Sequence, residues 1–587
     1  MAMTAQQCFM KQSCTSFPQS SRFVVSARVP SIRPWLRSPS PVPRSRPALN
    51  AASPTKGKKG LNIDRDGAPV VANDDKASID SFDFDSVLQR DLIANGPRST
   101  RRTKIICTIG PKSCSSEMLE MLAEAGMNCA RLNMTHETHE WHAAVIQRIR
   151  ELNQKRGYSV AIMLDTEGSE VHLAQCEPLN AEEGLEVALT IRHMDSYPPN
   201  TFRVNYEGFV DDVKVGDMVV VDGGMLTMEV SSIEGPDVKC TVVDPGLLLS
   251  RANITLRDRQ GRLIRGKNAN LPVITAKDWL DIDFAISQGV DFLAISYVKS
   301  ADVLANVKSY IDSRRSQDQS PIGVVAKIES SDALPNIESI ARSADTVMIA
   351  RGDLGAQIPL EQVPAVQQEI TMVCQALGTP VIVASHLLQS MIQYPTPTRA
   401  EVADVAEVVR QKADALMLSG ESAMGSYPEK AMDVLRAVAI RTEEWCRQES
   451  VQFDGSELPH ISDNIEGRIQ EEICQAAASM ADKLKVKAIC VFTRRGTTAS
   501  MLSRCRPDCP IFAFTDANDV RRKANLRWGV MPFRFDFVSD VEVNVQLAFT
   551  FLKARGLAAD GDHVVLVSDL KPTPDEAVRS IQVRQIK

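Results

Sequence analysis

Short apolar runs recur along most of the chain, and helical patterns separate them. Eight of these runs, beginning at Thr103, have the length of buried strands. They cover residues 103–109, 127–132, 158–165, 290–298, 322–329, 345–350, 380–387 and 413–419. Between Glu361 and Gly378, apolar residues recur every three or four positions, and Gly378 marks the end of a helix. Eight alternations of strand and helix predict an α/β fold of the TIM (β/α)8 barrel type.

The alternation breaks off between His172 and Asn270. The sequence there predicts short strands joined by turns, with turn residues at 215–217, 222–224 and 234–236. This pattern is typical of a small all-β domain. Because it follows the third predicted barrel strand, it is inserted at the mouth of the barrel, where it is well placed to act as a lid.

A third pattern begins after Glu444, where a helix precedes further strands. We predict strands at Val486–Thr493, Ile511–Thr515 and His563–Ser568, and a helix that opens at 494–498. These elements predict a separate C-terminal α/β domain of three layers. The length of the chain agrees, because 587 residues are too many for a single core.

The N-terminal segment differs from everything that follows it. No Asp or Glu occurs before Asp64, whereas Ser, Arg and Pro are plentiful. Such a composition is typical of an organelle transit peptide, and its Ser and Pro content favours the plastid (chloroplast) stroma over the mitochondrion. The alternative is a basic disordered tail that binds an anionic partner. The predicted division is a transit peptide at 1–63, an N-terminal extension at 64–102, barrel parts at 103–171 and 271–444, the lid at 172–270 and the C-terminal domain at 445–587.

Setting this segment aside changes the charge balance. Ten of the 67 Lys and Arg precede Asp64, so 57 basic residues face 74 acidic ones in the remainder, a net charge of −17. So acidic a body argues against binding to nucleic acid. No apolar run reaches about 18 residues, which argues against a membrane span. The thirteen cysteines lack paired or zinc-ligand spacing and predict reduced thiols in an intracellular compartment.

Charged residues stand at the ends of two predicted barrel strands. Run 322–329 ends in Lys327 and Glu329, which alternation places on one face, and run 345–350 is followed by Gly352 and Asp353. Two carboxylates without His or Cys beside them favour Mg²⁺ or Mn²⁺. Lys327 would supply positive charge to a transferring phosphoryl group, and Gly352 would let backbone N–H groups approach an anion. The alternative is an ordinary ion pair at a strand end.

The second and third strands end in further polar residues. Alternation places Arg131, Asn133 and Thr135 on one face. Arg131 carries a rigid fork of donors that suits a phosphate. Together with Asp165 and Thr166, the oxygens of Asn133 and Thr135 form a candidate cage for a monovalent cation.

Seven motifs together resemble the pyruvate kinase family, in that family's order. They are Thr103–Pro111, Met127–His136, Leu164–Gly168, Asn270–Pro272, Ala350–Gly355, Pro395–Asp404 and Leu418–Ala423. The resemblance implies the barrel fold with its lid, and phosphoryl transfer from phosphoenolpyruvate to ADP, giving pyruvate and ATP. It also implies these site residues: Lys327, Arg131 and Ser385 for catalysis; Arg131, Lys327, Gly352, Asp353 and Ser385 for the substrate; Asn133, His136 and Lys267 for the nucleotide; Glu329 and Asp353 for Mg²⁺; and Asn133, Thr135, Asp165 and Thr166 for K⁺.

Departures from the family pattern gather near the lid. The usual Asp-Thr-Lys-Gly-Pro-Glu-Ile-Arg segment has Glu167 in place of its lysine and His172 in place of its arginine, a phosphate-contacting residue in the family. Gly223, Glu137 and Asn268 also replace usual residues. With the N-terminus, these make the chain resemble the plastid alpha-type subunits, which implies a homo- or hetero-oligomer with a paralogous subunit.

Two alternatives to an independently active enzyme stay open. One is a weakly active or regulatory subunit that completes a hetero-oligomer, which His172 and Gly223 favour. The other is a different Mg²⁺-dependent barrel enzyme that acts on phosphoenolpyruvate or pyruvate, but that alternative leaves the C-terminal domain unexplained.

Overall fold

The computed structural model describes residues 101–169, 171–221, 225–250, 252–259, 273–448, 458–568 and 579–587. The chain divides into two compact units, Met1–Asp75 and Lys76–Lys587, and all described residues belong to the second. The predicted transit peptide at 1–63 and nearly all of the extension at 64–102 lie outside the described residues.

Eight parallel strands close into a barrel in the order β1-β16-β15-β14-β13-β12-β3-β2. Seven lie within the predicted runs, and β2 extends one residue past its run: β1 (Lys104–Thr108), β2 (Cys129–Asn133), β3 (Ala161–Asp165), β12 (Phe292–Ile295), β13 (Gly323–Ile328), β14 (Thr346–Ala350), β15 (Val381–Ala384) and β16 (Ala415–Leu418). The predicted TIM barrel is therefore confirmed.

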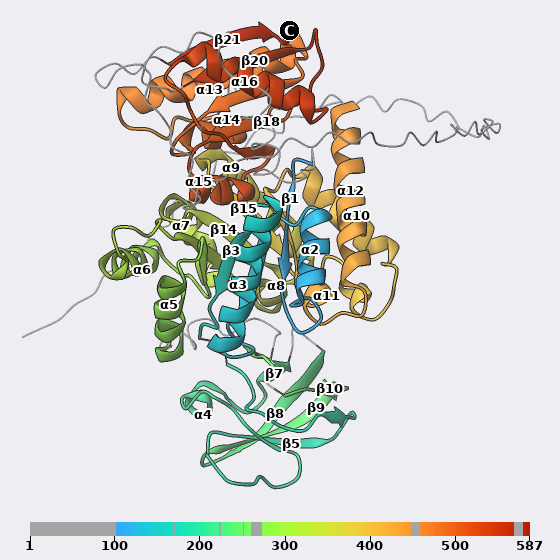
Figure 1. Ribbon diagram of the computed structural model, residues 1–587. Coiled ribbons are helices and arrows are strands. Elements are labelled where there is room, and N and C mark those ends of the chain that lie inside the picture. Colours follow the sequence, from blue (N-terminus) through green and yellow to red (C-terminus); the bar gives the residue numbers. More distant parts are fainter. Residues whose placement is uncertain are drawn as a thin grey trace, which may run out of the picture. The chain divides into compact units, whose positions relative to one another are not determined.

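A helix follows each barrel strand before the next one begins (Figure 1). These helices are α2 (Ser116–Glu124), α3 (His139–Arg156), α5 (Ala276–Gln288), α6 (Ala301–Arg314), α7 (Ile337–Ser343), α9 (Val363–Leu377), α10 (Arg399–Arg410) and α12 (Pro428–Gln448), with the short α8 (Arg351–Gln357) and α11 (Gly420–Ala423) between them. The predicted helix before Gly378 is α9, and Gly378 ends it in the left-handed conformation.

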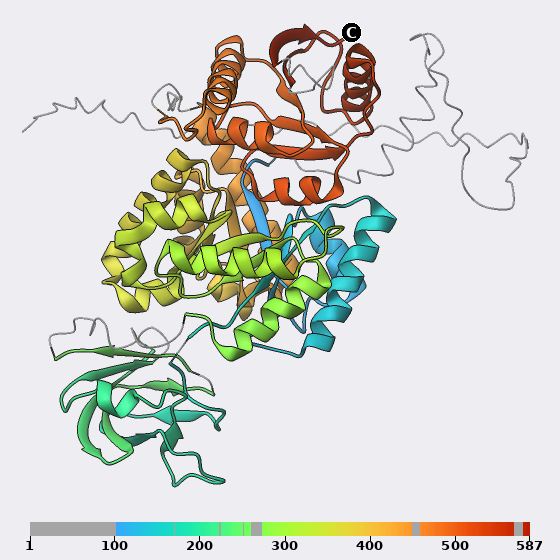
Figure 2. The ribbon, with the colours of Figure 1, turned by 90° about the vertical axis from the view of Figure 1, so that its left-hand side faces the viewer.

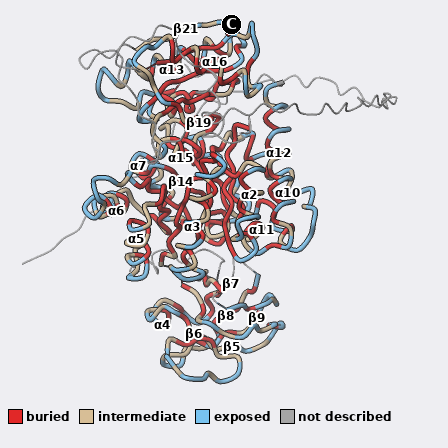
Figure 3. Tube along the Cα trace, in the orientation of Figure 1, coloured by how far each residue is buried: buried red, intermediate tan, exposed pale blue. Residues whose placement is uncertain are grey.

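Alternation along the strands builds two apolar layers (Figure 3). Ile106 of β1 lies in the barrel interior with Met163, Val325 and Met348, while Ile105 packs in the larger cluster with the helices. Both layers are buried, so the strands have apolar side chains on both faces. This core fixes the register that places polar residues at the strand ends.

Between β3 and α5 the chain forms the inserted sheet, ordered β11-β7-β8-β9-β5-β6 (Figure 2, blue-green). Its strands are β5 (Glu186–Thr190), β6 (Thr201–Arg203), β7 (Met218–Val221), β8 (Leu226–Glu234), β9 (Asp237–Asp244) and β11 (Ile254–Arg257). A two-stranded ladder of β4 (Leu179–Ala181) and β10 (Gly246–Leu248) and the short helix α4 (Phe209–Asp212) complete this region. The prediction of short strands there is confirmed.

The C-terminal sheet has the order β19-β18-β17-β20-β21. Its strands are β17 (Ala488–Phe492), β18 (Ile511–Thr515), β19 (Val530–Arg534), β20 (His563–Ser568) and β21 (Ser580–Gln585), and its helices are α13 (Ile465–Leu484), α14 (Thr497–Arg504), α15 (Asn518–Lys523) and α16 (Val541–Ala554). The predictions for β17, β18 and β20 are confirmed. The sequence analysis missed β19, which contains Pro532, and β21, which is only partly buried. Helix α12 continues to Gln448, past position 444, where the sequence predicts the barrel to end.

Two further expectations concern the chain's environment. The cysteines within apolar runs (Cys107, Cys129, Cys374 and Cys490) are free and buried. Among the residues that the structure describes, no helix is both long enough and apolar enough to cross a membrane.

Candidate active site

Asp165 lies at the centre of a polar cluster at the C-terminal ends of neighbouring barrel strands. Its Oδ2 accepts a hydrogen bond of 2.7 Å from Nε of Arg131 on β2, and its Oδ1 lies 3.1 Å from Nζ of Lys327 on β13. Asp165 is fully buried. Burial would raise the pKa of this carboxyl, but the charges of Lys327 and Arg131 outweigh burial and hold the pKa below its usual value.

The ammonium of Lys327 has three oxygen neighbours. Besides Asp165 it contacts Oε1 of Glu329 at 2.9 Å, and it donates to Oγ of Ser296 at 2.7 Å. Strands β12 and β13 pair at Ile295 and Ala326, so the next residue on each strand is brought together. Burial would lower the pKa of Lys327, yet attraction to Asp165 and Glu329 outweighs it, so the ammonium stays charged.

Glu329 is buried beside a second carboxylate. Its Oε2 accepts a hydrogen bond of 2.7 Å from the backbone N–H of Tyr297. Burial raises the pKa of Glu329 to about 7 against the attraction of Lys327, and the charge of Asp353 adds to the rise. Lys327 and Glu329 lie together as predicted, although β13 ends at Ile328 and Glu329 is the residue that follows it.

Asp353 and Gly352 lie in α8, which begins directly after β14. Asn253 of the inserted region donates a long hydrogen bond of 3.5 Å to Oδ1 of Asp353. A Cβ on Gly352 would lie 3.7 Å from Cβ of Ser385, so these two residues are neighbours. Arg351 donates two hydrogen bonds, of 3.1 and 2.7 Å, to the carbonyl oxygen of Ser385 and fixes this segment against α8.

The candidate cation cage spans β2 and β3. Asn133 pairs with Asp165 in the strand register, and Oδ1 of Asn133 accepts the N–H of Thr135 at 3.3 Å. The carbonyl oxygen of Thr166 accepts the hydroxyl of Ser296 at 2.7 Å. Thr135 does lie beside Asn133, but alternation along a strand is not the cause. Strand β2 ends at Asn133, and Thr135 lies in the turn that follows.

Lys277 joins three segments beside this turn, a role that the sequence analysis missed. Its Nζ donates to the carbonyl oxygen of Met134 at 2.6 Å and contacts Glu167 at 3.1 Å and Asp281 at 3.0 Å. Nε2 of His139 lies 2.7 Å from the other oxygen of Asp281. The i, i+4 spacing of Lys277 and Asp281 at a helix start was the available signal, but only the fold brings Met134 there.

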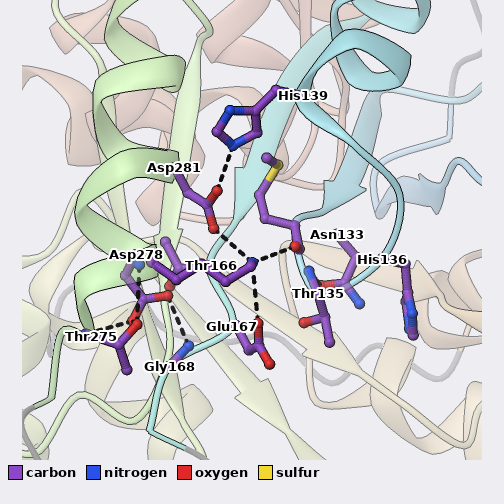
Figure 4. Close-up of polar contacts among 12 residues, drawn as sticks. Asn133, Thr135, His136, His139, Thr166, Glu167, Gly168, Thr275, Asp278 and Asp281 are labelled. Atoms are coloured by element: carbon purple, nitrogen blue, oxygen red, sulfur yellow. Dashed lines mark hydrogen bonds and ion pairs between the residues drawn. The ribbon is translucent and has the colours of Figure 1, made fainter. Parts of the chain in front are cut away.

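Asp278 completes the same helix start. Thr275 and Asp278 form a capping box, and Oδ1 of Asp278 accepts the N–H of Gly168 at 3.0 Å. The first turn of α5 therefore holds both the turn after β2, through Lys277, and the segment after β3, through Asp278 (Figure 4).

His172 lies at the start of the inserted region. Its Nδ1 donates to the carbonyl oxygen of Leu173 at 2.8 Å, and its Nε2 lies 3.6 Å from Oε1 of Glu167. Because Oε2 of Glu167 contacts Lys277, this carboxylate lies between Lys277 and His172. Two of the residues that depart from the family pattern, Glu167 and His172, are thus neighbours.

The side chains at the site offer oxygen atoms as ligands for the metals that the family resemblance implies. Among the described residues, no group of three or more His, Cys, Asp and Glu side chains could hold a metal ion. The neighbouring carboxylates of Glu329 and Asp353 fit Mg²⁺ as hard oxygen donors, with water and substrate oxygens completing the shell. The amide, hydroxyl, carboxylate and carbonyl oxygens of the cage fit K⁺ in the same way.

The structure brings together most of the predicted residues but not all can be placed. Ser296 and Tyr297, which contact Lys327 and Glu329, were not predicted, although polar residues that follow a barrel strand are a recognised signal. Predicted Lys267 lies outside the described residues, as do Gly223 and Asn268.

Two family models match the chain. The one described as "Pyruvate kinase, barrel domain" matches residues 100–432. The one described as "Pyruvate kinase, alpha/beta domain" matches residues 471–577. Together they cover the barrel strands with the inserted region and most of the C-terminal sheet.

Named relatives cover most of the chain as well. It is 54% identical to "Pyruvate kinase isozyme A, chloroplastic" of Ricinus communis, over 94% of this chain and 92% of the relative. It is 43% identical to "Pyruvate kinase isozyme G, chloroplastic" of Nicotiana tabacum, over 86% of each chain. A bacterial "Pyruvate kinase", from Geobacillus stearothermophilus, is 36% identical over 80% of this chain and 77% of its own length.

Proposed function

Because this chain belongs to the pyruvate kinase family, we propose that the cluster around Asp165 and Lys327 is its active site. The chain is a phosphotransferase whose substrates are phosphoenolpyruvate and ADP and whose products are pyruvate and ATP. The observation that carries the assignment is the buried Lys327 ammonium, held by Asp165, Glu329 and Ser296 where the strands end.

Lys327 supplies a fixed positive charge for the phosphoryl group in flight. Phosphoryl transfer depends mainly on positioning and on electrostatic stabilisation of the equatorial oxygens. Three neighbouring oxygens hold the ammonium in place before substrate arrives, so little reorganisation is needed in the transition state. Its raised pKa keeps the charge present throughout the neutral range.

Arg131 binds the phosphate of phosphoenolpyruvate. Its Nε and Nη1 are engaged by Asp165 and Thr108, at 2.7 and 3.1 Å, which orients the guanidinium plane and leaves Nη2 to meet the substrate. Gly352 lets backbone N–H groups approach and bind the substrate carboxylate. Ser385, its neighbour, would supply a hydroxyl near the carbon that gains a proton.

The family generally uses Mg²⁺ and K⁺, and we assign their ligands on this chain. Glu329 and Asp353 would hold Mg²⁺ (or Mn²⁺), which would supply positive charge to neutralise the phosphate oxygens. Asn133, Thr135, Asp165 and Thr166 hold K⁺. Asn133 and His136 lie beside the nucleotide, together with Lys267, whose placement the structure does not describe.

The names of the relatives support a plastid location, and we propose the stroma within it. Since two differently named chloroplastic isozymes match the chain, we also propose that it forms an oligomer, either with itself or with a paralogous isozyme. The alternative of a weakly active or regulatory subunit is not favoured, because the chain retains the charged residues of the cluster.

The test is pyruvate and ATP formation by the purified full chain, alone and co-expressed with an isozyme G paralogue. We expect activity from the chain alone that needs both phosphoenolpyruvate and ADP. A Lys327→Met preparation, purified identically, controls for contaminating enzyme. Activity seen only in the co-expressed sample, and unaffected by Lys327→Met in this chain, would establish the regulatory alternative.

A further inference from the structure

Ser296 lies directly after β12, at the level where the barrel strands end, and is fully buried. Its Oγ accepts a hydrogen bond of 2.7 Å from Nζ of Lys327 and donates one of 2.7 Å to the carbonyl oxygen of Thr166. Its backbone N–H also donates to Oγ1 of Thr166, at 3.2 Å. The side chain of Ser296 therefore joins the segment after β3 to the ammonium on β13.

The donor and acceptor roles in this chain of hydrogen bonds are set by the chemistry of the three groups. A hydroxyl has one proton to donate, an ammonium can only donate and a carbonyl oxygen can only accept. The proton of Ser296 must therefore point to Thr166, which leaves the lone pairs of Oγ for Lys327. Thr166 thus sets the orientation in which Ser296 receives the ammonium.

Ser296 differs from the other two oxygen neighbours of Lys327. Asp165 also accepts a hydrogen bond from Arg131, which binds the substrate phosphate in the proposed site. Glu329 is a proposed Mg²⁺ ligand and is charged. Ser296 is neutral, and of these three neighbours it is the one that is neither a proposed metal ligand nor bonded to a substrate-binding residue other than Lys327.

Close packing holds Ser296 in this position. A Cβ on Gly168 would lie 2.5 Å from Cβ of Ser296, closer than real side chains approach. Gly168 has a φ of +78°, which favours glycine, and its N–H donates to Asp278 at 3.0 Å. Ser296 is therefore covered by anchored backbone, which leaves its side chain little room to move.

We propose that Ser296 is a positioning residue, which fixes the direction of the Lys327 ammonium for phosphoryl transfer. This inference rests on the proposed function, in which Lys327 supplies the positive charge. Stabilisation of a transition state by a charged group depends on the placement of that group before the reaction. Because Ser296 acts through Lys327 in this role, its contribution should disappear when Lys327 is absent.

The experiment is a double-mutant cycle in the full chain, measured by steady-state kinetics with phosphoenolpyruvate and ADP. Ser296→Ala should lower kcat about tenfold, because the ammonium loses a hydrogen-bond acceptor and its fixed direction. The KM for phosphoenolpyruvate should change less than about twofold, since the contact matters in the transition state. In the Lys327→Met background, Ser296→Ala should change kcat less than about twofold, because residues that act as a unit are not additive.

Ser503→Ala is the matched control. Ser503 is also buried, donates to the carbonyl oxygen of Trp528 at 2.7 Å and accepts from Arg506 at 3.3 Å, all in the C-terminal domain. This variant should keep the kcat of its parent in both backgrounds. Ser296→Cys keeps a weaker acceptor, so its kcat should lie between those of the wild type and Ser296→Ala. It also replaces Ser296→Ala in the cycle if circular dichroism shows that alanine prevents folding.

A loss of kcat in Ser296→Ala that vanishes in the Lys327→Met background supports the positioning role. A further loss of about tenfold in that background would assign Ser296 a general structural role and overturn the proposal. Folded Ser296 variants with the wild-type kcat, beside a strongly impaired Lys327→Met, would overturn this inference alone. If Lys327→Met itself keeps the wild-type rate, the proposed function is wrong and this inference falls with it.

Discussion

The cluster around Asp165 and the segment that follows it into the inserted region begin at the same strand but are built differently. In the cluster, Asp165, Lys327 and Glu329 are almost completely buried and their bonds are no longer than 3.1 Å. In the following segment, the side chains of Glu167 and His172 are 11% and 15% exposed, little more than that of Lys327, but their nearest oxygen and nitrogen are 3.6 Å apart, too far for a hydrogen bond. A buried charge that loses a close partner is strongly destabilising, whereas the loss of so long a contact costs little.

Two of the chain's departures from the family pattern lie in this segment. Residues of the cluster match the family pattern, while Glu167 and His172 replace its Lys and Arg together. Glu167 keeps its place because Lys277 and His172 both lie beside it, so the new side chains form their own contacts. The comparison therefore predicts large effects for changes in the cluster and small ones for changes in the segment.

The largest effect is expected for Lys327→Met. Methionine fills similar space but removes the charge beside the transferring phosphoryl group, which should lower kcat roughly 10²–10³-fold. Steady-state kinetics with phosphoenolpyruvate and ADP measure it, and circular dichroism checks the fold. Lys308→Met, a lysine on α6 paired with Asp345, is the control and should keep full activity. A folded Lys327→Met enzyme with more than half the activity would remove Lys327 from the mechanism.

The second-largest effect is expected for changes to the two proposed Mg²⁺ ligands, Glu329 and Asp353. Changes around a metal site that leave its ligands in place typically cost about 10–100-fold in affinity, so loss of a ligand should cost at least as much. Glu329→Gln and Asp353→Asn should therefore weaken Mn²⁺ binding, measured by water-proton relaxation. Asp433→Asn, whose exposed carboxylate pairs with Arg436 on α12, is the control. Unchanged Mn²⁺ affinity in both variants would mean that the ion binds elsewhere.

The proposed cage for a monovalent cation predicts a smaller, several-fold effect of K⁺ on the reaction rate. Potassium chloride should stimulate the enzyme over an equal concentration of tetramethylammonium chloride, because the bulky ion cannot enter a cage of side-chain and carbonyl oxygens. Asn133→Leu should reduce the difference between the salts. Equal rates of the wild type in both salts would exclude the cage, whatever the variant does.

Features that depend on residues close together in the sequence were predicted, whereas contacts between distant residues were not. Barrel strands follow from apolar runs, and the contact of Lys327 with Glu329 follows from alternation within one strand. The hydrogen bond from Lys277 to the carbonyl oxygen of Met134 joins positions 143 residues apart, so no local sequence pattern predicts it. Strand β19 was missed because Pro532 argues against a strand in the middle of a sheet, and it is tolerated here on the edge strand.

A variant of Lys277 tests whether the two regions act independently, because Lys277 contacts both Glu167 and the carbonyl oxygen of Met134. Lys277→Met removes the ammonium that holds Met134 near Asn133 and His136, so it should raise the KM for ADP about fivefold, the equivalent of about 1 kcal/mol. The KM for phosphoenolpyruvate should change less, because Arg131 and Lys327 do not contact Lys277. Lys277→Arg should recover part of the loss. Equal increases in both KM values would assign Lys277 a general structural role instead.

The smallest effect is expected for His172→Arg, which restores the family's residue. Arginine brings a permanent charge toward the substrate phosphate, but Glu167, 3.6 Å from the histidine it replaces, should capture the guanidinium in an ion pair. We therefore expect at most about a twofold rise in kcat/KM for phosphoenolpyruvate, since such pairs are worth about 0.2–1 kcal/mol. Glu167→Gln combined with His172→Arg should release the arginine and raise the rate further, whereas Glu167→Gln alone should not. If the single variant gains more than the double variant, Glu167 does not restrain this position, and the proposed independence of the segment from the cluster is wrong.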